Sequence, residues 1–202
     1  MSKIVRLGIV LFAITAVTGL ILGGVYTVTL EPIRAAKERE KMEALSATLP
    51  GATDFKRIEV KGAPGIIKEV NEGTADGKVV GYNITVTPKG YGGPIEMVVG
   101  ISSDGRLMDI RILAHNETPG LGAKAPEPAF AGQFKNRKAD ALRVTKAAPT
   151  SDNEIQAISG ATITSTAVVT GVNTALDYWK TVIREGGNTA SDGLASKKGE
   201  GK

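Results

Sequence analysis

A long apolar run near the N-terminus places the strongest constraint on the fold. Residues 7–30, LGIVLFAITAVTGLILGGVYTVTL, carry no charged side chain. At a rise of 1.5 Å per residue, a helix of these ~24 residues is roughly 36 Å long, which exceeds the ~30 Å hydrocarbon core of a bilayer. The apolar region of a cleaved signal peptide is shorter, about 7–15 residues, and ends at an A-x-A-like site, which this run lacks. The sequence therefore predicts a retained transmembrane anchor.

The basic residues around this run do not settle which way the anchor crosses the membrane. Lys3 and Arg6 precede it and favour an N-terminus inside the cell. Four basic residues follow it between positions 34 and 41, so the count after the span is at least as high. Because acidic neighbours contribute little to the positive-inside rule, charge alone leaves both orientations open.

After the anchor, the pattern changes from helical to strand-like. Residues 31–50 have a charged face and a loose apolar stripe, which predict a juxtamembrane helix that is stopped by Pro50 and Gly51. Residues 55–115 are strand-like, and within them residues 95–114 predict a hairpin whose second arm contains a slip that indicates a bulge. Because the strands are clustered and helices flank them, the predicted fold class is α+β.

The C-terminal part of the chain supplies the helices of this domain. Residues 126–136 predict a short helix, residues 141–146 a strand, and residues 165–185 a longer helix. The apolar residues of the longer helix recur at helical spacing, so they are assigned to the core. Residues 186–202 lack apolar periodicity and are predicted to be disordered. The expected organisation is an anchor (1–30), a juxtamembrane helix (31–50), one α+β domain (51–185) and a tail (186–202).

Composition excludes several classes of function. The chain has no cysteine and one histidine, so it cannot supply thiolate ligands for an iron–sulfur cluster or a histidine-rich metal site of its own. Its net charge is a modest +4, aromatic residues make up 4%, and no basic stripe is visible, which argues against nucleic-acid binding. We therefore expect neither a metal site nor a nucleic-acid partner.

The stretch AISGATITSTAVVTGV, residues 157–172, gathers six hydroxyl side chains just before and within the expected long helix. Two interpretations are open, because Ser and Thr cap helices and a helix N-terminus also stabilises a phosphate. The stretch is neither a Walker loop nor a nucleophile elbow, and His115 lacks the motif context of a hydrolase base. No catalytic residue is therefore assigned.

Three segments, in this order, resemble a known family. GYGGPI (Gly90–Ile95) and HNETPGLGAK (His115–Lys124) are similar to two loops of covalent-FMN domains, and SGATITS (Ser159–Ser165) resembles their flavinylation motif. These domains occur in the G subunit of the Rnf ion-translocating oxidoreductase and in the related C subunit of the Na⁺-pumping quinone reductase. The short linker after the anchor and the HNETPGLG loop are closer to the Rnf G subunit. The resemblance covers nearly the whole chain up to about residue 185.

The resemblance implies a covalent FMN, joined by a phosphoester to the threonine that corresponds to Thr164. The neighbouring motif residues are expected at the phosphate, as small residues that clear room, as caps or as hydrogen-bond donors: Ser159, Gly160, Ala161, Thr162 and Ser165. Spacing and composition alone do not distinguish Thr164 from Thr162, Ser165 or Thr166 as the attachment point.

The second motif implies a loop beside the flavin. Thr118, Leu121 and Gly122 are expected to line the flavin, with Pro119-Gly120 forcing the turn. His115 and Glu117 are expected to orient this loop or to tune the flavin. The alternative is a purely structural turn with a histidine that faces solvent.

The implied function is that of a membrane-anchored flavoprotein subunit that carries electrons through its FMN in an Rnf-type pump, which couples ferredoxin and NAD to Na⁺ or H⁺ movement. The implied partners are the other membrane subunits of the complex and a flavin transferase that uses FAD. The family places the domain on the extracytoplasmic side of the inner or plasma membrane. Two alternatives stay open: a membrane-anchored FMN domain with a sensory or regulatory role, and a non-redox scaffold subunit whose hydroxyls are only caps.

Overall fold

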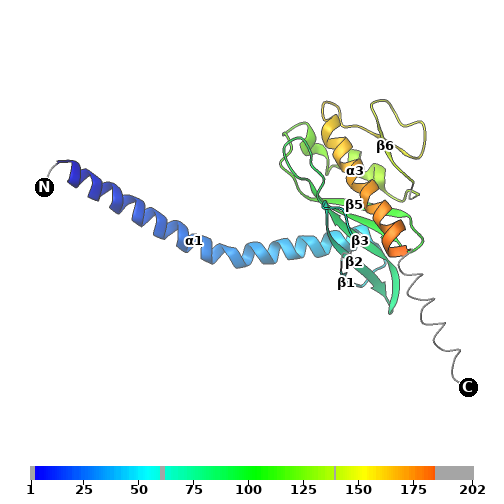
Figure 1. The fold of residues 1–202 in the computed structure, drawn as a ribbon, viewed down its shortest axis with the longest axis horizontal. Helices are drawn as coiled ribbons and strands as arrows, with labels where there is room; N and C mark the ends of the chain where they lie inside the picture. The colour runs from blue at the N-terminus through cyan, green and yellow to red at the C-terminus, as the bar shows by residue number, and fades with distance from the viewer. Residues whose placement is uncertain (1–2, 60–61, 139, 185–202) are drawn as a thin grey trace, which may run out of the picture. The chain divides into compact units, whose positions relative to one another are not determined.

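The computed structural model describes residues 3–59, 62–138 and 140–184 (Figure 1). The chain divides into two compact units, residues 1–42 and residues 43–202. The predicted disordered tail, residues 186–202, lies outside the described residues.

Helix α1 (Lys3–Thr48) continues through both of the helices that the sequence predicts. It contains the apolar run 7–30, and by length and composition it is able to cross a membrane. The sequence predicts a separate helix over residues 31–50, but Pro32 lies inside α1, where it removes one backbone hydrogen bond and the flanking turns continue. The second compact unit begins at Glu43, so the last residues of α1 belong to the domain.

Five strands form an antiparallel meander beside helices, which confirms the α+β class. The strands are β1 (Asp54–Ile58), β2 (Ile67–Ala75), β3 (Lys78–Val86), β4 (Glu96–Ser102) and β5 (Leu107–Ala114), and each pairs with the next. The predicted hairpin corresponds to β4 and β5. The predicted bulge lies in β5, because the register steps from Asp109 opposite Gly100 to Leu107 opposite Ile101 and skips Met108.

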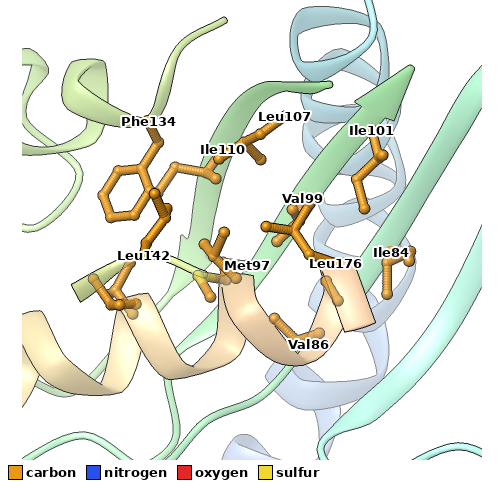
Figure 2. Close-up of a cluster of buried hydrophobic side chains, with 14 of the residues drawn as sticks. Ile84, Val86, Met97, Val99, Ile101, Leu107, Ile110, Phe134, Leu142 and Leu176 are labelled. Carbon is orange, nitrogen blue, oxygen red and sulfur yellow. The ribbon is translucent and has the colours of Figure 1, made fainter. Parts of the chain in front are cut away.

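Helices cover both faces of the sheet. Neighbouring residues of a strand point to opposite faces. In β4, Val99 shares one core cluster with Leu176 of helix α3 (Thr162–Tyr178), whereas Val98 clusters with Leu45 from the end of α1. Figure 2 shows Leu176 among the strand residues of the larger cluster. Burial on both faces fixes the register of the strands that lead to the site.

The rest of the domain consists of short elements around α3. They are η1 (Gly122–Lys124), α2 (Pro128–Ala131), η2 (Gly132–Phe134), β6 (Arg143–Thr145), β7 (Glu154–Gln156) and η3 (Trp179–Arg184). The predicted short helix and strand correspond to α2–η2 and to β6. Strand β7, which pairs with β6 in parallel, is not predicted. Helix α3 begins at Thr162, earlier than the predicted Ser165, since Gly160 with φ of 76° turns the chain directly into it.

Candidate functional site

Three segments meet where the strands end on one side of the sheet. In an antiparallel meander the end of β3, the start of β4 and the end of β5 lie next to one another. The loop 87–95 therefore lies beside the segment that follows β5. A Cβ on Gly92 would collide with the carbonyl oxygen of Asn116, so the two segments touch along their main chains. The start of α3 reaches the same place, because a Cβ on Gly122 would lie 2.5 Å from Thr164 Oγ1.

These segments enclose a pocket of about 470 Å³. The pocket brings together residues of all three family-like segments, which lie apart along the chain. Seven of the predicted site residues line it: Thr118, Leu121, Gly122, Gly160, Ala161, Thr162 and Thr164. Tyr91, Glu117 and Ile163 complete the lining. The other two predicted residues, Ser159 and Ser165, are not part of the lining.

A buried carboxylate–hydroxyl pair lies in the wall of this pocket. The Thr164 hydroxyl donates a hydrogen bond to Glu117 Oε2. The backbone N–H groups of Gly92 and Tyr91 donate to the Glu117 carboxylate at 2.9 and 3.3 Å. Glu117 is 6% exposed and Thr164 is 1% exposed. One carboxylate therefore joins the loop after β3, the loop after β5 and the start of α3.

The half-buried ring of His115 accepts a hydrogen bond from the main chain of its own loop. The backbone N–H of Glu117 donates to His115 Nδ1 at 3.3 Å. This contact supports the prediction that His115 and Glu117 orient the loop.

Glu117 is held in its ionised form. Burial, the largest influence, raises the pKa of its carboxyl. The hydrogen bonds from Thr164, Gly92 and Tyr91, together with the nearby His115, outweigh burial and bring the pKa below the ordinary value of 4.5. An ionised carboxylate only accepts hydrogen bonds, so the shared proton belongs to the Thr164 hydroxyl.

The start of α3 offers free N–H groups to the pocket. Its N-cap residue is Ala161, and no side chain caps the helix. Among the described residues, no hydrogen-bond acceptor faces the backbone N–H groups of Thr162, Ile163 and Thr164. These groups and the partial positive charge of the helix N-terminus suit an anion. The interpretation of the hydroxyls as caps therefore fails for Ser159 and Thr162.

Ser165 has a structural role at the same helix start. Its Oγ accepts a hydrogen bond from the Ile158 N–H at 3.0 Å and donates one to the Ala161 carbonyl at 2.9 Å. The side chain is fully buried, so its hydroxyl is engaged on both sides and holds the turn that leads into α3. Ser159 is exposed, and its contact with a phosphate stays a prediction.

Three exposed apolar side chains border the pocket. Tyr91 is 70% exposed, Ile163 57% and Leu121 41%, although large apolar side chains lose free energy when they face water. Tyr91 and Ile163 were missed as site residues, because an apolar side chain inside a motif carries no chemical signal of its own. Together with the free helix N-terminus, this rim fits a ligand that has a phosphate and a flat apolar ring system, as FMN does.

The chain is similar to known proteins over the residues of this pocket and over most of its length. Residues 90–177 match the family described as FMN-binding domain. The chain is 39% identical to the G subunit of the proton-translocating ferredoxin:NAD(+) oxidoreductase complex of Clostridium ljungdahlii, over 80% of this chain and 83% of the relative. It is 36% identical to the G subunit of the Na(+)-translocating ferredoxin:NAD(+) oxidoreductase complex of Acetobacterium woodii, over 87% of this chain and 91% of the relative.

A solved structure shares the fold. The crystal structure of the C subunit of the Na(+)-translocating NADH-quinone reductase from Parabacteroides distasonis matches with a TM-score of 0.58 at 20% identity, over 75% of this chain and 96% of that one. At this identity the match shows a shared fold, and the resemblance to the G subunit is confirmed by the relatives above. Because relatives with more than a third of identical residues align over most of both chains, the protein belongs to the G-subunit family of ion-translocating oxidoreductase complexes, and its pocket lies in an FMN-binding domain.

Proposed function

We propose that this protein is the electron-carrying flavoprotein subunit of an Rnf-type pump, in which electron transfer between ferredoxin and NAD drives Na⁺ or H⁺ across a membrane. The names of its relatives, its FMN-binding domain and its apolar N-terminal helix support this. When bound, FMN supplies the redox chemistry, and the protein fixes its position and its surroundings. The observation that carries the proposal is the Thr164 hydroxyl, which lines the pocket at a helix N-terminus with free N–H groups.

The FMN is joined to Thr164 Oγ1 through a phosphoester. Four hydroxyls are candidates by spacing, and their surroundings in the fold favour this one. Ser165 is engaged in two hydrogen bonds, and Thr166 is absent from the pocket lining. Thr162 lines the pocket, but no carboxylate among the described residues accepts a hydrogen bond from its hydroxyl. Thr164 is buried in the pocket wall against an ionised carboxylate. Gly160 and Ala161 leave room for the phosphate to approach the main chain.

The test of this function is production of the full chain with an active flavin transferase and FAD. We expect flavin absorbance that survives denaturation, and an intact mass that exceeds the polypeptide mass by one FMN less one water. Flavin that is lost on denaturation would contradict the covalent link alone. A protein that holds no flavin at all would support the scaffold alternative. Co-purification with several polytopic membrane subunits distinguishes an electron carrier from a sensor.

The loop after β5 gives a prediction about the flavin's environment. Changing Thr118→Ala and Leu121→Ala together removes two lining side chains, so the flavin's absorbance spectrum and reduction potential should both shift. The matched control is Val79→Ala, which truncates another apolar side chain of similar exposure at the opposite end of β3. If the double variant and the control both leave spectrum and potential as in the wild type, the loop does not border the flavin.

The domain lies on the extracytoplasmic side of the membrane, anchored by residues 1–30. Lys3 and Arg6 before the apolar run give weak support, since positive residues favour the inside. A reporter that is active only outside the cytoplasm, fused after Glu185, should give signal. A matched reporter that is active only in the cytoplasm should stay silent at this position, and the reverse result would overturn the assignment.

A further inference from the structure

We propose that Glu117 is the general base for the covalent modification of Thr164, so that the acceptor protein supplies part of the chemistry of its own flavinylation. The inference rests on the proposed attachment at Thr164. It adds a role for this chain in a reaction in which the transferase binds the flavin donor.

The position of the carboxylate carries the inference. Glu117 Oε2 accepts the hydrogen bond of the Thr164 hydroxyl, whose oxygen is the atom that has to attack. The backbone N–H groups of Gly92 and Tyr91 hold the carboxylate from the opposite loop. A Cβ on Gly122 would lie 2.5 Å from Thr164 Oγ1 and 2.7 Å from Glu117 Oε2, so this pair admits no further side chain.

A salt bridge with a lysine or arginine does not account for the charge of Glu117 in the described part of the chain. The two oxygens of its carboxylate accept from the N–H groups of Gly92 and Tyr91, and a glutamine, with one acceptor oxygen, would keep only one of these contacts. Beyond accepting these bonds, a carboxylate has the capacity to take a proton from the Thr164 hydroxyl that it contacts.

Attachment needs such a proton acceptor. A bond forms between Thr164 Oγ1 and the phosphorus that carries the riboflavin part of FAD. The phosphoanhydride bond to the adenylate breaks, and AMP leaves with the electron pair. The hydroxyl proton passes to the Glu117 carboxylate, and no atom changes its oxidation state. Because only 1% of Thr164 is exposed, bulk water is poorly placed to take this proton, whereas Glu117 already holds it in a hydrogen bond.

The same transfer removes an electrostatic conflict in the product. The ester oxygen of Thr164 has no proton to donate, and an ionised carboxylate beside a phosphodiester anion would be repelled at low dielectric. A protonated Glu117 is neutral and is able to donate a hydrogen bond in place of the one that is lost.

The experiment compares Glu117→Gln with Glu154→Gln in the full chain, using one transferase preparation with FAD and following FMN incorporation by intact mass. Glu154 is the control, because it is also buried and accepts hydrogen bonds from a backbone N–H and a hydroxyl, both of Thr150, but lies outside the pocket lining. Unlike Glu117, it also pairs with Arg143 at 2.9 Å, so its substitution is the more disruptive change of charge. We expect Glu117→Gln to lower the transfer rate at saturating acceptor by about 10²–10⁴-fold, with an unchanged KM for the acceptor. Glu154→Gln should label at nearly the wild-type rate.

Each outcome separates this role from the attachment itself. A wild-type protein that gains no FMN mass overturns attachment at Thr164. A wild-type protein labelled on Thr164, with Glu117→Gln labelled equally fast, overturns the general base alone. Thermal unfolding shows whether the variants fold. If Glu117→Gln does not fold, Glu117→Asp keeps a carboxylate that is one methylene shorter and should label more slowly than wild type. Wild-type labelling rates in Glu117→Asp would overturn the role, since a shortened base cannot reach the hydroxyl equally well.

Discussion

Protein that carries Thr164→Val is expected to acquire no covalent FMN, even with excess transferase and FAD. Valine keeps the branched shape of threonine but has no oxygen, so a phosphoester cannot form. The intact mass should equal the polypeptide mass, while the wild type is heavier by one FMN less one water. The domain should still fold, because the loss of one hydrogen bond to a charged group costs about 1.5–3 kcal/mol, which thermal unfolding measures. Glu117 also keeps the N–H groups of Gly92 and Tyr91.

Two further substitutions separate the attachment atom from its neighbours. Thr164→Ser retains a hydroxyl and should give partial labelling. Thr162→Val should leave attachment in place, since the Thr162 side chain is exposed. Peptide mapping that locates the flavin on Thr162, Ser165 or Thr166 would refute the assignment to Thr164.

The hydroxyl-rich stretch shows why part of the site is not readable from the sequence. Four hydroxyls within residues 162–166 look equivalent by spacing, and only the family resemblance singles out Thr164. The features that distinguish them are tertiary. The Ser165 hydroxyl accepts a hydrogen bond from the backbone N–H of Ile158. The Thr164 hydroxyl donates one to Glu117, which lies in the loop after β5. No local pattern encodes the contact between Thr164 and Glu117, because it forms only when the fold brings the loop after β5 beside the start of α3.

The sequence predicts the secondary structure best where a hydrophobic periodicity extends over many residues. The alternation in β3 and the hairpin of β4 and β5 identified the core of the sheet, and even the slip at Met108 was visible as a break in period. The short strand β7 is not predicted. The observed start of α3 differs from the predicted one, because a single glycine controls the turn before it. The start of α3 at Thr162 depends on the left-handed φ of Gly160. This shift places Thr162, Ile163 and Thr164 in the first helical turn, where their N–H groups are free.

Gly122 gives the second large expected effect, because it is the place where the two motifs touch. In Gly122→Ala the new Cβ would lie 2.5 Å from Thr164 Oγ1, 2.7 Å from Glu117 Oε2 and 2.9 Å from Glu117 Cβ. The buried pair would have to separate, so we expect attachment of FMN to slow by more than about tenfold, since a base that is displaced loses part of a ~10²–10⁴-fold contribution. Overpacking should also destabilise the domain by about 1–3 kcal/mol.

Gly132→Ala is the matched control for this substitution, and its expected sign is opposite. Gly132 has an ordinary helical conformation, with φ of −62°, and a Cβ there would meet no atom within 4 Å. The change should therefore stabilise the folded domain slightly, by about 0.4–1 kcal/mol, because it mainly restricts the unfolded chain. Its rate of FMN incorporation should match the wild type. The free energy of unfolding and the labelling rate are measured for both variants side by side. Equal labelling rates in the two variants would mean that the contact between the Gly122 main chain and the Thr164–Glu117 pair does not govern attachment, and that the loop after β5 yields freely when the flavin donor arrives.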